Sequence, residues 1–309
     1  MSAAPSTYGG QAVIEGVVIR GKRTLALACR LPNGEIYRYR EPLRSPLLRP
    51  GPARWPLVRG IVVLWESLSH GMRMLMRSAD LQLAEEERLG KGGNTMVTGA
   101  AFLIAIVVFI GVPYLATQLV RGALGERDLV VNLAEGALRL ALFLGYLYAI
   151  SLLPEIRRVF AYHGAEHMTI HAFEHADPLD VQHVRPYPTA HPRCGTAFLL
   201  LVVVIAIASF AFIPRVGVLI DLIVRLALVI PVAAVSYEVL RFGARHEGNP
   251  LMRLIVVPGL FLQRITTRRP EDAMIEVAIA SLEEALAGDA DASPEPAAPA
   301  PGAIDAEPA

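Results

Sequence analysis

Residues 97–120 read VTGAAFLIAIVVFIGVPYLATQLV, a run of 24 residues without a charged side chain. A helix rises about 1.5 Å per residue, so this run can cross the roughly 30 Å hydrocarbon core of a bilayer. Residues 196–213 form a second charge-free run, and the apolar segments 129–153 and 216–239 are also long enough. We therefore expect a mainly α multi-pass membrane protein with four transmembrane helices.

The two charged spans each carry an acid four residues before an arginine: Glu135 with Arg139, and Asp221 with Arg225. This spacing puts both members of a pair on one helix face, where they can neutralise each other. Two interpretations stay open. The pairs are either interfacial charges at the span ends, which is the simpler account, or a buried functional pair.

Composition supports a membrane partner. The 309 residues have zero formal net charge, and the mean hydropathy of +0.43 is high for a soluble domain. Residues 1–95 hold 14 Lys and Arg against 8 Asp and Glu, whereas residues 270–309 hold ten acids and no Lys or Arg. Beside apolar spans, the basic part favours anionic lipid, and no nucleic acid is expected. A homo-oligomer stays open.

Arginine placement predicts the orientation, because cytoplasmic loops carry an excess of Lys and Arg. Few arginines fall between spans one and two or between spans three and four, and most fall on the other side. Both termini and the loop of residues 154–194 should therefore be cytoplasmic. Cys29 and Cys194 lie far apart in different kinds of segment, which favours reduced thiols over a disulfide. No cleaved signal peptide is recognisable.

Outside the spans, Pro32-Asn33-Gly34 predicts a hairpin turn within residues 24–40, and residues 12–20 could add a third strand. Residues 56–77 place apolar side chains on one helix face and charged ones on another, which predicts an amphipathic helix on the inner leaflet. The expected regions are an N-terminal cytoplasmic β-hairpin region (1–55), an amphipathic interfacial helix with a linker (56–95), a first transmembrane hairpin (96–153), a cytoplasmic His-rich loop and helix (154–195), a second transmembrane hairpin (196–240), a cytoplasmic interfacial segment and helix (241–287), and a disordered tail (288–309).

The cytoplasmic loop contains YHGAEHMTIHAFEH at residues 162–175, which is the pattern HxxEH written twice. Pro154 can start a helix here, and Asp177-Pro178 can end it. His163 and His167, four residues apart, then share one face and can bind one metal ion. Glu166 lies beside them as a candidate general base, as in the inverted form of the HExxH metalloprotease motif.

One straight helix cannot deliver three of these histidines to one ion, because His163 and His171 lie about 12 Å apart along it. Either two metals bind, or Gly164 bends the helix, or a ligand comes from elsewhere. His191 and Cys194 in HPRCGT are the leading outside ligands, since zinc binds both residue types. Further candidates are His171, Glu174, Glu15, Glu238, Glu155 and His246.

Simpler interpretations also stay open. Histidines are common on solvated helix faces, and Cys194 could be a small buried residue or a nucleophile paired with His191.

Five motifs occur together in this order: GGQAVIEGVVIRG, YHGAEHMTIHAFEH, HPRCGT, SYEVLR and PGLFLQRITTRRPED. With them, residues 8–287 resemble the YqhQ-like family of bacterial membrane proteins, which carry a domain of unknown function. The resemblance implies a multi-pass inner-membrane protein and a metal-dependent enzyme without a known substrate. It transfers a site role to His163, Gly164, Glu166, His167, His191, Arg193, Cys194 and Glu15. It concerns the first HxxEH more than the second, which weakens His171 and His175.

We therefore predict a divalent metal site, with zinc as the metal, at the cytoplasmic membrane surface. His163 and His167 are the expected ligands, completed by His191 or Cys194, and Glu166 is the expected base. If the protein is an enzyme, metal-assisted hydrolysis is the natural reaction class. The alternative is a non-enzymatic membrane scaffold or assembly factor with a structural metal or histidine cluster.

Overall fold

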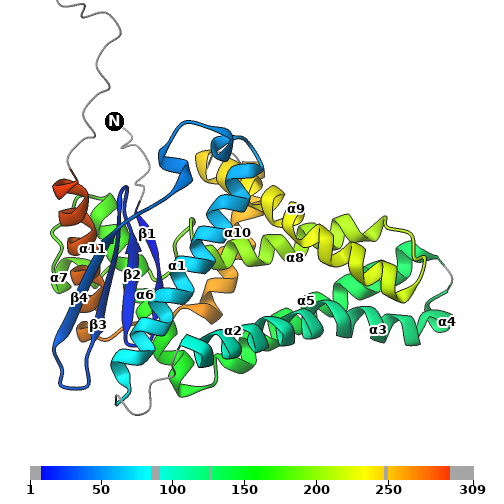
Figure 1. Ribbon diagram of the computed structural model, residues 1–309, viewed down its shortest axis with the longest axis horizontal. Coiled ribbons are helices and arrows are strands. Elements are labelled where there is room, and N and C mark those ends of the chain that lie inside the picture. The colour runs from blue at the N-terminus through cyan, green and yellow to red at the C-terminus, as the bar shows by residue number, and fades with distance from the viewer. Residues whose placement is uncertain (1–7, 85–90, 126, 247–249, 293–309) are drawn as a thin grey trace, which may run out of the picture.

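The computed structural model describes residues 8–84, 91–125, 127–246 and 250–292. The chain is mainly helical with a small N-terminal antiparallel sheet, as predicted. In Figure 1 the sheet and helices α6, α7 and α11 form one end of the molecule, and the long apolar helices extend from it.

The sheet is a four-stranded meander with the order β1-β2-β3-β4. The predicted hairpin joins β3 (Thr24–Arg30) to β4 (Ile36–Pro42), and its turn uses Gly34 at φ +90°. Residues 12–20 were expected to add one strand, and this was wrong. They contribute to two strands, β1 (Gly9–Val13) and β2 (Gly16–Arg20), joined by a turn in which Glu15 adopts φ +51°.

Helices cover both faces of this sheet, because its central strands are apolar on both sides. Val17 and Ile19 of β2 pack into a core with α6 (Pro154–Glu174) and α11 (Asp272–Asp291). Val18 and the other alternate positions form a second core with Met74 of α1 (Val58–Gln82). The sheet thus fixes α6, the helix that carries the histidines, against the rest of the end that carries the sheet.

Helix α11 runs to Asp291, so the expected tail cannot begin at residue 288. Asp289 explains the extension, because its carboxylate accepts hydrogen bonds from the Tyr8 hydroxyl and from the backbone N–H groups of Lys22 and Arg23. Residues 293–309 of the predicted tail lie outside the described residues.

Helix α1 contains the predicted amphipathic helix, but the first half of its apolar face does not pack on the protein. Ile61, Leu68 and Trp65 are exposed, Trp65 by 72%. Apart from Met74, the packed side uses small and polar residues, including Gly60 against Ala234 of α9. A row of exposed large apolar side chains thus runs along α1.

The apolar runs form helices close to their predicted bounds. The first is α2 (Lys91–Ile106) continued through a π-helical turn, η4 (Val107–Gly111), into α3 (Val112–Leu119). The others are α5 (Asp128–Ile150), α8 (Gly195–Ala211) and α9 (Val218–Arg245). Within the described residues, three helices are long and apolar enough to cross a membrane: Gly92–Leu119, Asp128–Ile150 and Val218–Gly243.

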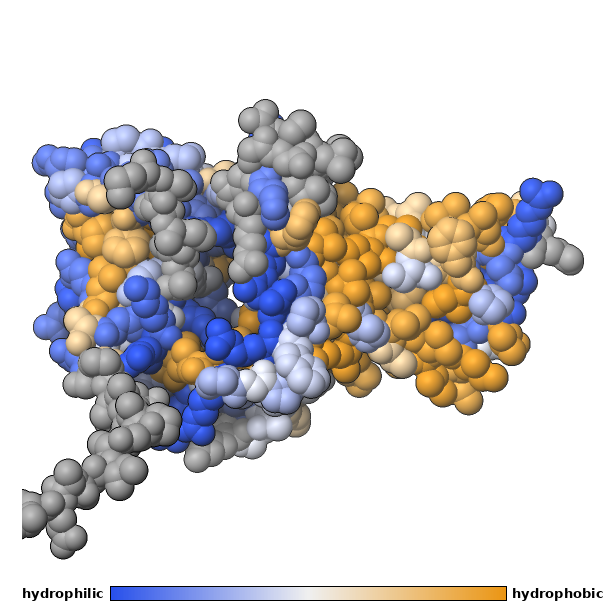
Figure 2. Space-filling model, turned by 90° about the horizontal axis from the view of Figure 1, so that it is seen from above, coloured by the Kyte–Doolittle hydropathy of each residue, from blue (hydrophilic) through white to orange (hydrophobic). Residues whose placement is uncertain are grey.

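Helix α8 is apolar but has only 17 residues, and α10 (Pro250–Thr266) packs beside it. Short helices complete the chain: η1 (Pro46–Leu48), η2 (Pro52–Arg54), α4 (Arg121–Leu124) and α7 (Val181–Val184). Figure 2 shows that apolar residues cover this helical part, whereas polar residues dominate the end that carries the sheet.

The charged pairs of the spans are buried in one network between helices, which argues against exposed span-end charges. Glu135 lies 2.5 Å from Arg139, 2.6 Å from Arg215 and 2.9 Å from Arg225, and all four side chains are almost fully buried. Asp221 accepts a hydrogen bond from the buried Tyr114 hydroxyl at 2.6 Å. These contacts tie α3, α5, α9 and the α8–α9 connection together.

Candidate metal centre

Helix α6 is continuous from Pro154 to Glu174, so Gly164 does not bend it as one alternative required. Gly164 instead lets another backbone segment approach α6 closely. A Cβ at Gly164 would lie 2.1 Å from the Arg268 carbonyl oxygen, and the Arg268 N–H donates to the Phe160 carbonyl at 2.9 Å. The segment that joins α10 to α11 therefore crosses directly over α6 beside His163.

One group of candidate ligands consists of His163, His167 and Cys194, whose donor atoms all lie within 4.8 Å of one another. The two histidines come from α6, and Cys194 caps the N-terminus of α8. His163 Nε2 lies 3.2 Å from Cys194 Sγ. Ligand atoms of tetrahedral zinc are about 3.3–3.6 Å apart, so any longer pair needs a contraction of at most about 1.5 Å.

Backbone carbonyls fix the orientation and the tautomer of both histidines. His163 Nδ1 lies 2.8 Å from the Thr266 carbonyl oxygen, and His167 Nδ1 lies 2.7 Å from that of Thr189. A carbonyl can only accept, so each Nδ1 carries a proton, and in the neutral imidazole each Nε2 then keeps a lone pair. Zinc-binding histidines are held in the same way.

Burial supports the neutral form that a histidine ligand needs. His167 is only 3% exposed. Desolvation lowers the pKa of His167, so its imidazole is neutral at pH 7. With their residue types, tautomers and spacing, the three side chains fit a zinc ion bound by two histidines and one cysteine.

A second group consists of His171, Glu174 and His191, also within 4.8 Å. It fits a metal less well, because Arg193 forms an ion pair with Glu174 and His171 Nε2 donates to the Ala190 carbonyl at 2.9 Å. Burial lowers the pKa of His171 to about 4. The sequence offered His191 as an alternative to Cys194 for the third ligand. Its Nε2 lies 3.4 Å from Glu174 Oε2 in this second group.

Gln263 of α10 holds the backbone at His191, close to Cys194 in the sequence. Its side chain accepts from the His191 N–H at 2.7 Å and donates to the His191 carbonyl at 2.9 Å. This clamp holds the backbone of the 191–194 turn. The structure therefore brings Cys194, and not His191, into one group with His163 and His167.

Glu166 belongs to neither group. Its Oε1 accepts from the Gly10 N–H of β1 at 2.9 Å, and its Oε2 is buried with no hydrogen-bond partner among the described residues. Desolvation raises the pKa of Glu166, while the nearby His163 opposes the shift. A buried, unpartnered carboxylate oxygen is suited to carrying a proton.

The remaining candidates also lie in neither group, and most have other partners. Glu15 pairs with Arg158 at 2.6 Å, and Glu238 pairs with Arg59 of α1. His175 and His246 bond to carbonyls of their own helices, and Glu155 is exposed in the first turn of α6.

Sequence reasoning missed the carbonyls of Thr189 and Thr266, because a backbone acceptor leaves no mark on residue identity. It also missed Gln263, which lies within the motif PGLFLQRITTRRPED and was detectable there as a polar residue in an apolar helix.

Comparisons with known proteins place these residues in a family context. A family model described as protein of unknown function (DUF1385) matches residues 55–288. The chain is 33% identical over 296 residues to a protein of Bacillus subtilis (strain 168) described as uncharacterized protein YqhQ. That alignment covers 91% of this chain and 93% of the relative. No solved structure matches the chain. The chain belongs to the DUF1385 family, in agreement with the resemblance of its motifs.

Proposed function

We propose that this chain is a four-span membrane protein that binds zinc through His163, His167 and Cys194 and uses it for metal-assisted hydrolysis. The observation that carries the proposal is the shared orientation of the three donors. Both imidazoles come from α6 and have Nδ1 atoms fixed by carbonyls, and the Cys194 thiol at the start of α8 lies 3.2 Å from His163 Nε2.

Three protein ligands are the number that catalytic zinc sites use, with the fourth position left for water or substrate. A bound zinc ion supplies Lewis acidity and lowers the pKa of water. Thr189 and Thr266 hold the imidazoles in place through their carbonyls. Glu166, buried one residue before His167, holds or releases a proton at Oε2.

The proposed membrane position rests on the exposed apolar surface. Leu119 and Phe212 at helix ends are more than 80% exposed. Many other large apolar side chains of these helices are also exposed, by smaller fractions. Bilayer lipid is the natural cover for such a surface. We propose that α8 spans together with the three longer helices, that α1 lies in the interface, and that both termini face the cytoplasm of a bacterial cell.

Helix α6 begins four residues after α5 ends, which puts its first turn near the membrane surface in this arrangement. A substrate would then be membrane-associated.

Turnover by zinc-loaded protein in nanodiscs tests the enzymatic part, with a panel of ester, amide and phosphoester substrates. His163→Ala/His167→Ala should abolish both zinc binding and turnover. Glu166→Gln should abolish turnover and keep the zinc. Retained turnover in Glu166→Gln would remove the base role, and retained turnover in the double variant would remove metal catalysis altogether.

A second function, a scaffold with a structural zinc ion, is favoured by the burial of His167 and Cys194 and by the bond between Glu166 and β1. Cobalt substitution distinguishes the two. An open position predicts that azide changes the visible spectrum of the cobalt protein. A closed, structural site predicts no change, together with a large loss of thermal stability when the metal is removed.

A further inference from the structure

A cavity of about 300 Å³ on α6 is lined by four arginines and by no member of the two ligand groups. Arg157 and Arg158 come from the first turn of α6, and Arg268 and Arg269 come from the segment that joins α10 to α11. Glu271, Ala161 and Met274 complete the lining. The lining thus holds four guanidinium groups and one carboxylate and is positive.

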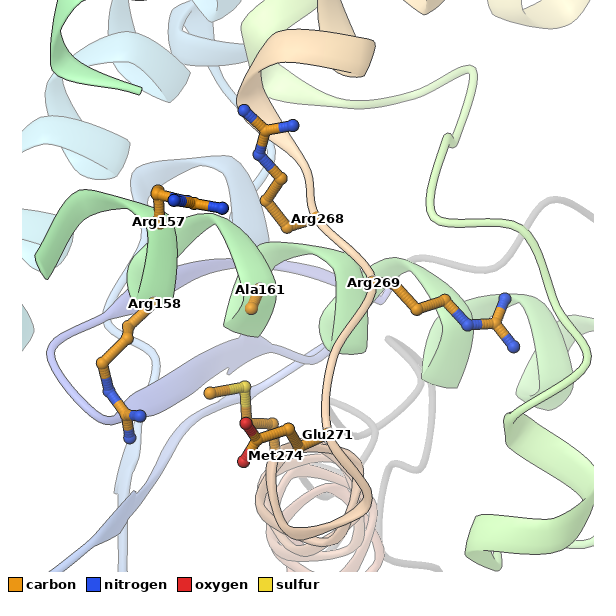
Figure 3. A pocket seen from close by; sticks show the side chains of 7 residues that line it. All are labelled: Arg157, Arg158, Ala161, Arg268, Arg269, Glu271 and Met274. Atoms are coloured by element: carbon orange, nitrogen blue, oxygen red, sulfur yellow. The ribbon is translucent and has the colours of Figure 1, made fainter. Parts of the chain in front are cut away.

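Two of these arginines already have partners. Arg158 forms a two-fold ion pair with Glu15, and Arg269 donates to the Arg185 carbonyl at 2.6 Å. In Figure 3, Arg158 and Arg269 extend away from the centre of the lining in different directions. Glu15 therefore offsets the charge of Arg158, and Arg269 adds a positive charge at the edge of the lining.

The other two, Arg157 and Arg268, make no side-chain hydrogen bond or ion pair within the part of the chain that the structure describes. Arg268 Nε is even buried without a partner. Figure 3 shows both side chains on the same side of α6, with the Arg157 guanidinium directed toward Arg268. Like charges held together and a buried unsatisfied donor are both unfavourable unless an anion joins them.

We propose that this cavity binds a phosphate group, held by Arg157 and Arg268. Guanidinium groups form paired hydrogen bonds with phosphate oxygens, and two of them supply enough donors for one phosphate. The membrane arrangement proposed above, on which this step rests, favours phosphate over other anions, because Arg157 follows the last residue of α5 by only seven positions and would lie near the lipid headgroups. A lipid headgroup or a soluble phosphate compound could deliver the same group. The site does not depend on bound zinc.

The experiment measures binding by calorimetry to detergent-purified full-length protein, at an ionic strength of about 0.15 M. The probes are inorganic phosphate, dioctanoyl phosphatidate and, as a zwitterionic comparison, dioctanoyl phosphatidylcholine. Arg157→Gln/Arg268→Gln should weaken phosphatidate binding by about tenfold per guanidinium removed. The matched control, Arg49→Gln/Arg54→Gln, removes the same charge from exposed positions near α1 and should change affinity less than about twofold.

Phosphatidate binding much tighter than phosphate binding identifies a lipid headgroup as the source, and equal affinities identify a soluble phosphate compound. Either result supports the site. Absence of saturable binding to both anions overturns it, as does an equal loss in the two variants or equally tight binding of the phosphatidylcholine. Should the double variant unfold, the exposed single variant Arg157→Gln carries the same test.

Discussion

Glu135→Gln is the substitution that the helical part should tolerate least. Among the residues that the structure describes, Glu135 is the only carboxylate within 3.0 Å of these arginine side chains. It lies 2.5 Å from Arg139, 2.6 Å from Arg215 and 2.9 Å from Arg225. The amide keeps the shape and removes the charge. Three guanidinium groups, each at most 6% exposed, then remain buried without their shared counter-ion.

Removing one partner from a buried ion pair costs about 3–5 kcal/mol, because the remaining charge stays desolvated. A loss of that size lowers the melting temperature by roughly 10 °C for a chain of this size. The matched control is Glu283→Gln, which makes the same chemical change in an exposed ion pair with Arg38 at 3.3 Å. Exposed pairs contribute less than about 1 kcal/mol, so this variant should melt like the wild type.

The assay is thermal unfolding in detergent, followed by circular dichroism at matched scan rates. A second variant, Glu135→Gln/Arg225→Met, should recover part of the loss, since it removes one of the unpaired charges. Equal melting temperatures for Glu135→Gln and wild type would refute the idea that this network holds the helices together.

Two further predictions concern the end of the molecule that carries the sheet. Gly164→Ala should destabilise the protein by about 1–3 kcal/mol and weaken zinc binding, because the new Cβ would push on the Arg268 carbonyl. Gly145→Ala, with open space around it, should be neutral or stabilising in the same thermal unfolding assay. Arg158 lowers the pKa of Glu15, so their pair stabilises the fold fully above the unfolded pKa of about 4.3 and loses this contribution as pH falls through the lowered value. Melting temperatures across pH 7 to 3 should therefore show Glu15→Gln less stable than wild type at neutral pH, with the gap closing in acid; a constant gap would contradict the pairing.

Local patterns predicted the elements whose signals are local. The turn at Asn33-Gly34 was found because Gly is the residue that accepts a positive φ most easily. The turn at Ile14-Glu15 was missed because Glu15 adopts a positive φ without such a signal, and β-branched residues on both sides look like one strand. Pro154 and the following Asp177-Pro178 bounded the histidine helix correctly, since both act on the backbone directly.

The candidate site depended on contacts that the sequence does not encode locally. The choice between His191 and Cys194 follows from Gln263, which lies 72 residues from His191 and clamps its backbone. The acid–arginine spacing of Glu135 and Arg139 predicted their own pair correctly. It could not reveal that Arg215 and Arg225 converge on the same carboxylate, because that depends on how separate helices pack.

Zinc content of detergent-purified protein, measured by elemental analysis without chelators, tests the central claim most directly. The account predicts about one zinc ion per chain in the wild type, and loss of the metal in His163→Ala/His167→Ala. The control His175→Ala/His246→Ala removes two histidines that lie in neither ligand group and should keep the metal. A wild type without zinc, or equal zinc in the two double variants, would contradict the assignment of His163, His167 and Cys194 as a metal centre.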